Sequence, residues 1–312
     1  MQINIPRAGL YHLYFPFWEA FFQALGVDIV LSPKTDKNIL MNGLRVANSE
    51  MCLPMKIMYA HVLALKDNGN PILLPQMDEV KTEGQPEFFC PFFVGLSDVM
   101  QAEFPELKIL RPKMIFQNGE IVKEPWIELA QESGFSKEQG ERACKEGLEK
   151  QKHFVFQMEK EEKLPLEILE GRKINPETEK SVALIGRPYL LYDEYSSLDL
   201  VKKIINKGYK IRTWETVSAK DSQEAFKKMP ESFHYHWHLT NRECGAILHL
   251  CQDPSIRGII YVTPFNCGPD FLIEEFVLRE IRKTKPVTMI SLDESSGEAG
   301  LDTRLDAFFD II

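Results

Sequence analysis

A β-α-β unit opens the chain within residues 3–31, INIPRAGLYHLYFPFWEAFFQALGVDIVL. Its apolar run Ile3–Ile5 predicts a strand, the aromatic-rich run Phe17–Leu25 predicts a helix that a glycine ends, and Val27–Leu31 predicts a second strand. A helix between two short apolar strands is typical of a parallel sheet that is covered by helices. We therefore expect the N-terminal part of the chain to have an α/β fold.

The same alternation continues along the chain and returns in its last third. Further strands are expected at residues 72–74, 181–186, 209–213, 258–263 and 287–292. Further helices are expected at residues 54–66, 196–207, 241–252 and 271–283. Residues 124–170 are rich in Glu, Lys and Gln and carry apolar residues at helical spacing, which indicates helices between two α/β regions.

These patterns predict an α/β protein of two Rossmann-like lobes with parallel sheets, connected by a mainly helical segment. A length of 312 residues suits two lobes that each have a core. The expected parts are an N-terminal lobe, residues 1–115, with Cys52 and Cys90, a helical connection, residues 116–178, and a C-terminal lobe, residues 179–312, with Cys267.

The composition excludes several classes of function. A formal net charge of −9 and a pI near 5.4 oppose binding to phosphate backbones, so we expect no nucleic-acid partner. No apolar run approaches the roughly 20 residues that a membrane helix needs, and the N-terminal MQINIPRAG does not resemble a signal peptide. We expect no membrane partner and a cytoplasmic location.

Three of the six cysteines share a sequence context. Cys52, Cys90 and Cys267 each have a proline one or two residues downstream, which favours a turn or the start of an element. Cys267 also follows a strand, at the carboxyl end where open α/β sheets place ligands, and Gly268 allows close approach there. In a chain without an export signal the cysteines are expected to be reduced, either as buried thiols or as metal ligands.

The sequence context of the other three cysteines favours a structural role for them. Cys144 lies in the charged helical stretch, and Cys244 and Cys251 are seven residues apart on one expected helix. The chain has no C-x-x-C pair, so it contains neither a zinc ribbon nor a ferredoxin-type run.

Six ordered motifs carry a resemblance to a known group of proteins. They are IPRAGLYHLYFPFWEAFFQALGVDIVLS, SEMCLPMKIMYAH, FFCPF, IGRPYLLYDEY, FNCGPDFLIEE and LDESSGEAGLDTRLDAF. The chain resembles the proteins related to 2-hydroxyacyl-CoA dehydratases and to the C-terminal part of the large CoA-substrate-specific enzyme activases. The resemblance implies that Cys52, Cys90 and Cys267 bind iron–sulfur cubanes.

This resemblance implies a [4Fe-4S] cluster, or a fused double cubane, in a low-potential electron-transfer or reductase component of an anaerobic cell. Three thiolates leave one iron open for another ligand. The chain has no G-x-x-x-x-G-K-[ST] motif, so ATP-driven reduction would need a separate ATP-dependent activase as partner. A second copy or a related subunit is the other expected partner.

The sequence leaves more than one function open. The family commonly has Gly-His where this chain has Ala60-His61, so no particular reaction is transferred and it is open whether the chain is itself an enzyme. An alternative from another class is a non-catalytic scaffold or cluster-assembly subunit of a dehydratase-like system.

Several further side chains are candidates for supporting roles. His61 and Arg187 are candidate second-shell residues, and the alternative for Arg187 is a turn that is salt-bridged to Asp193 or Glu194. The cluster of His234, His236 and His238 has the spacing of a metal site on a strand, or belongs to an aromatic-rich helix entry.

Overall fold

The computed structural model describes residues 1–81, 86–117, 119–229 and 235–312. The chain is divided into two compact units. The first contains residues 1–47, 55–154 and 236–238, and the second contains residues 48–54, 155–235 and 239–312. The lobe boundaries predicted at residues 115 and 178 remain a prediction.

A parallel sheet forms the centre of the first unit, with the strand order β2-β1-β3-β6. The apolar residues of β1 are fully buried, so this strand lies in the middle of the core. The four strands are β1 (Gln2–Ile5), β2 (Asp28–Leu31), β3 (Ile72–Leu73) and β6 (Ile109–Leu110). The expected β-α-β opening is therefore present.

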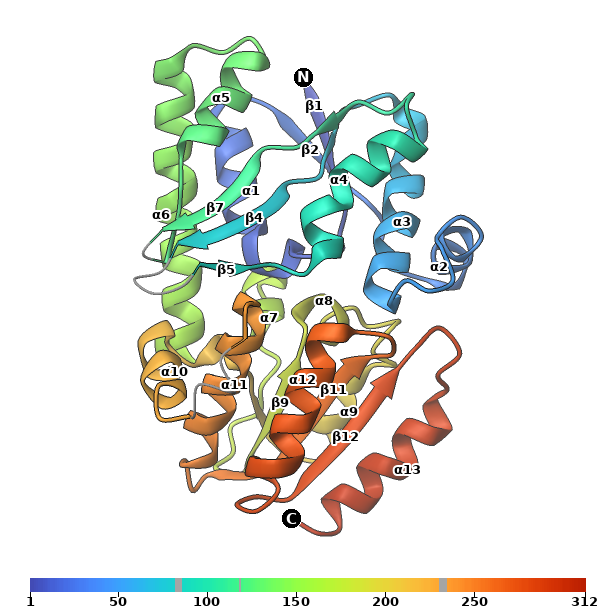
Figure 1. Ribbon diagram of the computed structural model, residues 1–312, viewed down its shortest axis with the longest axis vertical. Helices are drawn as coiled ribbons and strands as arrows, with labels where there is room; N and C mark the ends of the chain where they lie inside the picture. The colour runs from blue at the N-terminus through green and yellow to red at the C-terminus, as the bar shows by residue number, and fades with distance from the viewer. Residues whose placement is uncertain (82–85, 118, 230–234) are drawn as a thin grey trace. The chain divides into compact units, whose positions relative to one another are not determined.

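A second, mixed sheet of the first unit was not expected from the sequence. Its order is β5-β4-β7-β8, with β4 parallel to β7 and an antiparallel strand at each edge. In Figure 1, β4 and β7 run side by side. These strands are β4 (Gln76–Lys81), β5 (Glu87–Phe88), β7 (Lys113–Gln117) and β8 (Glu120–Ile121).

An aromatic cluster joins helices of the first unit. The Trp126 ring on α5 makes edge contacts with Phe17 and Phe21 of α1 at centroid distances of 4.8 and 5.3 Å. The helices are α1 (Tyr11–Ala24), α2 (Lys37–Leu44), α3 (Leu53–Leu65), the 3₁₀ turn η1 (Lys66–Asn68), α4 (Pro91–Glu103), α5 (Glu124–Glu132) and α6 (Lys137–Glu161).

Helix α1 begins at Tyr11, so the start predicted at Phe17 is wrong. Pro16 lies inside the helix, where it cannot donate a backbone hydrogen bond. Nine of the 14 residues of α1 are buried, several of them aromatic. The burial of this apolar surface outweighs the missing hydrogen bond.

The second unit is built on one fully parallel sheet with the order β10-β9-β11-β12. Every residue of β9 is buried, which agrees with a central strand that is covered on both faces. The strands are β9 (Ser181–Gly186), β10 (Lys210–Arg212), β11 (Ile256–Pro264) and β12 (Val287–Leu292). The α/β class with parallel sheets is thus confirmed for both units.

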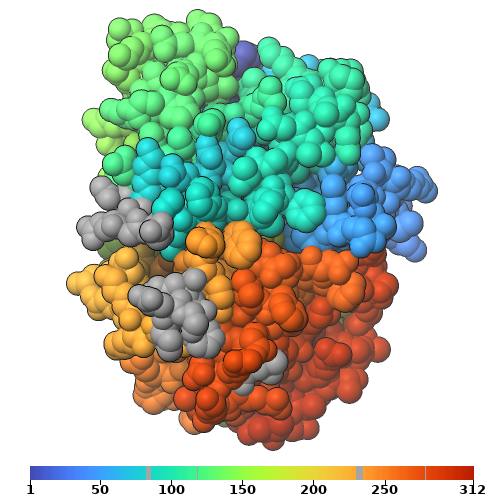
Figure 2. Space-filling view, viewed as in Figure 1, coloured from blue at the N-terminus to red at the C-terminus, as the bar shows by residue number. Residues whose placement is uncertain are grey.

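Helices surround this second sheet, and α13 packs beside β12 (Figure 1). In Figure 2, the later part of the chain, in orange and red, forms most of the visible surface of the second unit. The helices are α7 (Pro165–Glu170), α8 (Pro188–Leu191), α9 (Leu200–Asn206), the 3₁₀ turn η2 (Trp214–Thr216), α10 (Ala219–Phe226), α11 (His238–Cys251), α12 (Gly268–Phe276), a π-helical turn (Val277–Ile281) and α13 (Glu298–Phe309).

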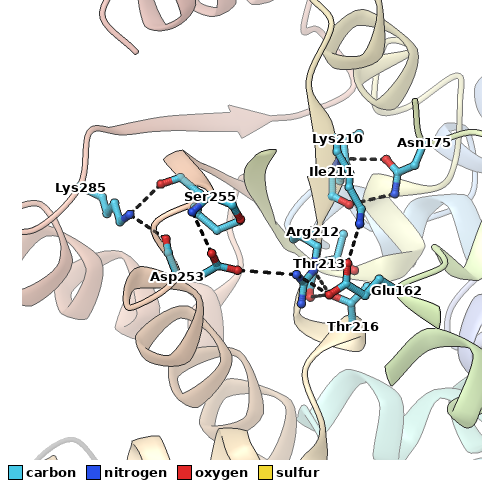
Figure 3. Close-up of polar contacts among 11 residues, drawn as sticks. Glu162, Asn175, Lys210, Ile211, Arg212, Thr213, Thr216, Asp253, Ser255 and Lys285 are labelled. Carbon is cyan, nitrogen blue, oxygen red and sulfur yellow. Dashed lines mark hydrogen bonds and ion pairs between the residues drawn. The ribbon is translucent and has the colours of Figure 1, made fainter. Parts of the chain in front are cut away.

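A polar network ties β10 to the segments that precede β11 and β12 (Figure 3). Glu162 accepts contacts from Lys210 at 2.5 Å and from Arg212 at 2.7 Å. Lys285 donates to the backbone oxygens of Asp253 and Ile256 at 2.9 and 2.7 Å. We call Glu162, Lys210, Arg212, Asp253 and Lys285 the amino-end network, because Asp253 and Lys285 precede the amino ends of β11 and β12.

Among the described residues, no helix combines the length and the apolar character that crossing a membrane requires.

Candidate functional site

The three cysteines singled out by their prolines each lie directly before a helix. Cys52 precedes α3, while Cys90 and Cys267 are the N-cap residues of α4 and α12. All three are partly exposed. The first backbone N–H groups of a helix have no partner inside the helix, and the helix dipole favours negative charge there. The expected position at the start of an element is confirmed.

The remaining cysteines lie within helices. Cys144 is buried in α6, and burial raises the pKa of its thiol to about 12. Cys244 is buried in α11, where burial also raises the pKa of the thiol. Cys251 is the last residue of α11 and is partly exposed, and burial again raises its pKa. These environments disfavour thiolates, in agreement with the expected structural role.

Cys267 occupies the carboxyl end of the second unit's sheet, as the sequence predicts. Strand β11 ends at Pro264, and Asn266 has a left-handed backbone with φ of 64° directly before the cysteine. Asparagine tolerates this conformation better than most residues. The turn therefore leaves the strand sharply and directs the chain into α12.

Cys52 and Cys267 belong to the same compact unit. Burial is the main cause that raises the pKa of Cys267, with Asp270 adding to it and Arg187 opposing it. The charge of Cys52 raises the pKa of Cys267 further, so the two thiols lie close enough to interact electrostatically.

Space remains beside Cys267. A Cβ atom added to Gly268 would meet no other atom within 4 Å. The close approach that the sequence suggested is therefore not made by another protein segment. Phe265 and Phe271, on either side of the cysteine, are 58% and 67% exposed. The residue after Cys267 therefore faces open space, and exposed phenylalanines lie on either side of the cysteine in the sequence.

A buried charge cluster lies at the carboxyl ends of β9 and β11. Arg187 directly follows β9 and contacts Asp270 Oδ1 through Nε at 2.7 Å and Nη2 at 2.5 Å. Its Nη1 lies 3.0 Å from Glu243 Oε1, and its Nη2 donates to Thr240 Oγ1 at 3.2 Å. We call Arg187, Glu243 and Asp270 the carboxyl-end cluster. The partners expected for Arg187, Asp193 or Glu194, are wrong.

This cluster holds more negative than positive groups away from water. The side chains of Arg187, Glu243 and Asp270 are 3%, 0% and 0% exposed. Both carboxylate oxygens of Glu243 and Oδ2 of Asp270 have no hydrogen-bond partner. Burial raises the pKa of Glu243 to about 8, although Arg187 opposes the rise. Burial therefore favours the protonated form of Glu243.

Gly186, which precedes Arg187, is required by packing. An added Cβ atom would lie 2.4 Å from the carbonyl oxygen of Val262, on the neighbouring strand β11. The glycine lets the two strands approach closely at the point where the chain turns toward Arg187.

Cys90 stands in a similar apolar setting in the first unit. Phe88 and Phe92, two residues to either side, are 41% and 44% exposed. The carbonyl oxygen of Cys90 accepts hydrogen bonds from Phe93 and Val94 in the first turn of α4, which fixes the cap. The first unit therefore presents its thiol at a rigid helix start.

His61 is fully buried in α3 of the first unit. Its Nδ1 lies 2.7 Å from Ser32 Oγ, and its Nε2 lies 2.9 Å from Thr35 Oγ1. The backbone N–H of Arg7 donates to Ser32 Oγ, so that hydroxyl has its own proton left to donate to Nδ1. Both ring nitrogens therefore engage hydroxyls that follow β2, and they anchor the helix that begins after Cys52.

The structure describes two residues of the expected histidine cluster, His236 and His238. His234 lies outside the described residues. His236 is exposed, and His238 Nδ1 contacts Glu87 Oε2 at 2.6 Å. More generally, the described part of the chain shows no group of three or more His, Cys, Asp or Glu side chains that could hold a metal ion.

The sequence analysis missed Glu243 and the role of Asp270. Glu243 falls on a face of α11 with Thr240, Cys244 and Ile247, all of which are buried. An acid on an apolar helical face was the available signal. Asp270 stands three residues after Cys267 in the first turn of α12, where an acid is common, so this signal was ambiguous.

Comparison with known proteins assigns the family. The family described as "CoA enzyme activase uncharacterised domain" matches residues 2–217, which include Cys52, His61, Cys90 and Arg187. Cys267 lies beyond the matched residues. No curated protein matches the sequence. The matched part is more than half of the chain, and the protein therefore belongs to the CoA enzyme activase domain family.

Proposed function

We propose that the protein holds a cubane-type iron–sulfur cluster through Cys52, Cys90 and Cys267, as a [4Fe-4S] cluster or part of a fused double cubane. In this proposal the chain is a low-potential electron-transfer or reductase component. Such a cluster, when bound, stores and passes single electrons. The observation that carries the proposal is that these three thiols, and none of the other three cysteines, directly precede helices.

The helix starts supply what an anionic cluster needs. Backbone N–H groups without intrahelical partners can donate to sulfur, and the positive end of the dipole offsets negative charge. Hydrogen bonds to sulfur are also one of the factors that set a cluster's reduction potential. Gly268, directly after Cys267, faces open space, since an added Cβ atom there would meet no other atom within 4 Å.

In this proposal, Arg187 and His61 act by holding two helices in position. Arg187 contacts Asp270 in the first turn of α12, and so holds the helix that begins after Cys267. His61 anchors α3, which begins after Cys52. Among the described residues, the three cysteines are not assembled into a group of candidate ligands, so the proposal rests on their helix-start positions.

The family ties the chain to the activation of CoA-dependent enzymes. We propose that a separate ATP-dependent activase delivers the electron, since the sequence lacks a P-loop motif. A second copy of the chain or a related subunit would complete a double cubane. If the chain takes up no cluster, its proposed role becomes that of a non-catalytic scaffold or assembly subunit.

The test is cluster content in protein that is purified and reconstituted without oxygen. Iron, acid-labile sulfide and the visible spectrum are measured for the wild type and for Cys52→Ser, Cys90→Ser and Cys267→Ser. Cys251→Ser is the matched control, because Cys251 is also partly exposed but ends a helix. We expect each of the first three variants to lose most of its iron, since a hydroxyl is a far poorer ligand than a thiolate, and the control to keep it.

Two results would overturn the proposal. A wild-type chain that binds no stoichiometric iron and sulfide after reconstitution has no cluster. Equal iron in the wild type and in all three variants would mean that other residues hold it. Circular dichroism of each variant separates lost ligands from lost fold.

A further inference from the structure

The parallel sheets of the two units have the same strand order. In each sheet the second strand in chain order lies at one edge, followed by the first, third and fourth strands, as in β2-β1-β3-β6 and β10-β9-β11-β12. The chain order reverses between the first and third strands, and open α/β sheets bind ligands beyond the carboxyl ends of these two strands. The expected ligand positions are therefore the carboxyl ends of β1 and β3 in the first unit and of β9 and β11 in the second.

An arginine follows the first strand of the sheet in both units. Arg7 and Arg187 each come two residues after a fully buried isoleucine, which is Ile5 or Ile185. The guanidinium of Arg187 directs Nε and Nη2 to Asp270 Oδ1, at 2.7 and 2.5 Å. The second unit therefore occupies its arginine with a carboxylate of its own.

The guanidinium of Arg7 has no such partner. Arg7 is partly exposed, its Nε is buried without a hydrogen-bond partner, and it forms no ion pair with any residue in the described part of the chain. Its backbone N–H, by contrast, donates to Ser32 Oγ, directly after β2, at 2.8 Å. A buried polar atom without a partner is costly and calls for an explanation. The backbone is thus held in place while the charged end of the side chain is left for another group.

The loop that carries Arg7 packs against the counterparts of the helices that supply the partners of Arg187. A Cβ atom added to Gly9 would lie 2.7 Å from Met58 Cε on α3 and 3.2 Å from Phe93 Cε1 on α4. Helices α3 and α4 come before and after the third strand of their sheet, as α11 and α12 do in the second unit. The same two positions of the fold therefore surround both arginines.

Neither helix of the first unit offers Arg7 the carboxylate that its counterpart offers Arg187. Three residues after the N-cap cysteine, α12 has Asp270, whereas α4 has the buried Phe93. Helix α11 contributes Glu243, whereas the sequence of α3 contains no acid. The first unit thus has the arginine of this arrangement without its counter-ions.

The remaining acids of the surrounding elements do not take the place of those carboxylates. Asp36, in the segment after β2, caps the first turn of α2 by accepting a backbone N–H at 2.8 Å. On α4, Asp98 pairs with Arg111 at 2.6 Å, and Glu103 is the last residue of the helix. Glu19 lies on α1, about 11 Å along the helix axis from its first residue. The guanidinium therefore stays without a counter-ion in the described part of the first unit.

We propose that Arg7 binds a small organic carboxylate at the carboxyl end of the first unit's sheet, in the manner in which Arg187 binds Asp270. The ligand accepts the N–H of Nε, the buried atom that now lacks a partner, together with an N–H of a terminal nitrogen. A planar guanidinium presents such paired donors to a carboxylate. This inference is independent of the cluster proposal, because no cysteine takes part in the contact.

NMR of the full chain with isotope-labelled arginine observes the contact directly. Each Nε–Hε pair gives its own signal, and the variant Arg7→Lys identifies that of Arg7 by its loss. We expect propionate to shift the Arg7 signal in a saturable manner and to leave the signal of Arg187 in place, because Asp270 already occupies that guanidinium. Propionamide should bind about tenfold more weakly, since a charge-assisted contact contributes about 1.5 kcal/mol or more. Sodium chloride at equal ionic strength is the salt control.

A substitution on α4 can supply the missing carboxylate from within the chain. Phe93→Asp places an acid three residues after Cys90, as in α12, and should abolish propionate binding by occupying Arg7. Phe93→Asn is the matched control, because it removes the same buried ring and adds no charge, and it should keep propionate binding. Circular dichroism checks that both variants fold.

Calorimetric titration of Arg7→Lys with propionate keeps the test independent of the Phe93 variants. Lysine keeps the charge but lacks the paired donors, so we expect affinity to fall about tenfold. The proposal is wrong if propionate at millimolar concentration leaves the Arg7 signal unshifted, or if propionamide or chloride shifts it equally. It is also wrong if inorganic phosphate binds more tightly than propionate, or if Arg7→Lys keeps the affinity of the wild type.

Discussion

The two ends of the second unit's sheet hold charged side chains in opposite ways. In the amino-end network, the side chains of Arg212, Glu162 and Asp253 are 13%, 34% and 33% exposed, and water can complete their hydration. In the carboxyl-end cluster, the three side chains are almost completely buried, and one guanidinium faces two carboxyl groups. The amino-end network is therefore a set of partly exposed ion pairs that stabilises the fold.

The amino-end network and the carboxyl-end cluster also differ in their hydrogen bonding. Arg212 contacts Glu162 at 2.7 Å and donates to Thr216, and Lys285 donates to two backbone oxygens. At the other end, Glu243 Oε2 and Asp270 Oδ2 have no hydrogen-bond partner, and Glu243 Oε1 has only its ion-pair contact with Arg187. Buried polar atoms without partners are costly, and a fold retains them where they serve a site. This contrast agrees with the proposal of a site at the carboxyl end of the sheet, where Cys267 lies.

The largest expected effect is the loss of Arg187. We expect Arg187→Met to lower the free energy of unfolding by about 3–5 kcal/mol, because it leaves two buried carboxyl groups without a cation. The same substitution at the amino end, Arg212→Met, should cost far less. Urea denaturation of both variants measures the difference.

Further substitutions show whether the lost charge of Arg187 causes the lower stability of Arg187→Met. Adding Glu243→Gln and Asp270→Asn to Arg187→Met removes the unpaired buried charge and should restore part of the stability. If the triple variant is less stable than Arg187→Met alone, the packing of the arginine and not its charge is responsible.

Stability should fall with rising pH because of buried carboxyl groups. Burial raises the pKa of Glu243 to about 8 and that of Glu215 to about 7, from an ordinary value of 4.5. The folded chain therefore keeps protons that the unfolded chain releases above pH 4.5, and this contribution is lost as pH rises through 7 and 8. Between pH 5.5 and 8.5 we expect a loss on the order of 5 kcal/mol for the two groups together.

Urea denaturation across this pH range checks the expectation. Glu243→Gln and Glu215→Gln imitate the protonated side chains, so the double variant should show a much flatter pH profile than the wild type. A wild-type profile that is flat or rises over this range would contradict the raised pKa values.

Secondary-structure elements were predicted from the sequence better than side-chain contacts were. Seven of the eight strands of the two parallel sheets could be located because their apolar runs are short and bounded by turn residues, whereas β6, Ile109–Leu110, was missed. The mixed sheet was missed because β4, Gln76–Lys81, has only two buried residues, Met77 and Val80, among polar ones. The preceding proline delayed the predicted start of α1, since the packing of its aromatic residues could not be seen in the sequence.

Arg187 shows why the site was only partly predictable. Its candidate partners were acids six and seven residues away, yet its actual partners come from α11 and α12, 56 and 83 residues away in the numbering of Glu243 and Asp270. The order β9-β11 in the sheet brings these helices together, and strand order is a property of the tertiary structure. The helix-start position of the three cysteines, by contrast, followed from adjacent prolines, which act locally.

The smallest effect belongs to the amino-end network. We expect Arg212→Met to lower the free energy of unfolding by about 1 kcal/mol or less, because its ion pairs with Glu162 and Asp253 are partly hydrated. The difference from the wild type should shrink further in 1 M NaCl, where the Debye length is about 3 Å. The loss caused by Arg187→Met should persist in the same salt, since buried charges are screened much less. Urea denaturation at low and high salt measures both variants, and an equal salt response at the two ends would remove the distinction between them.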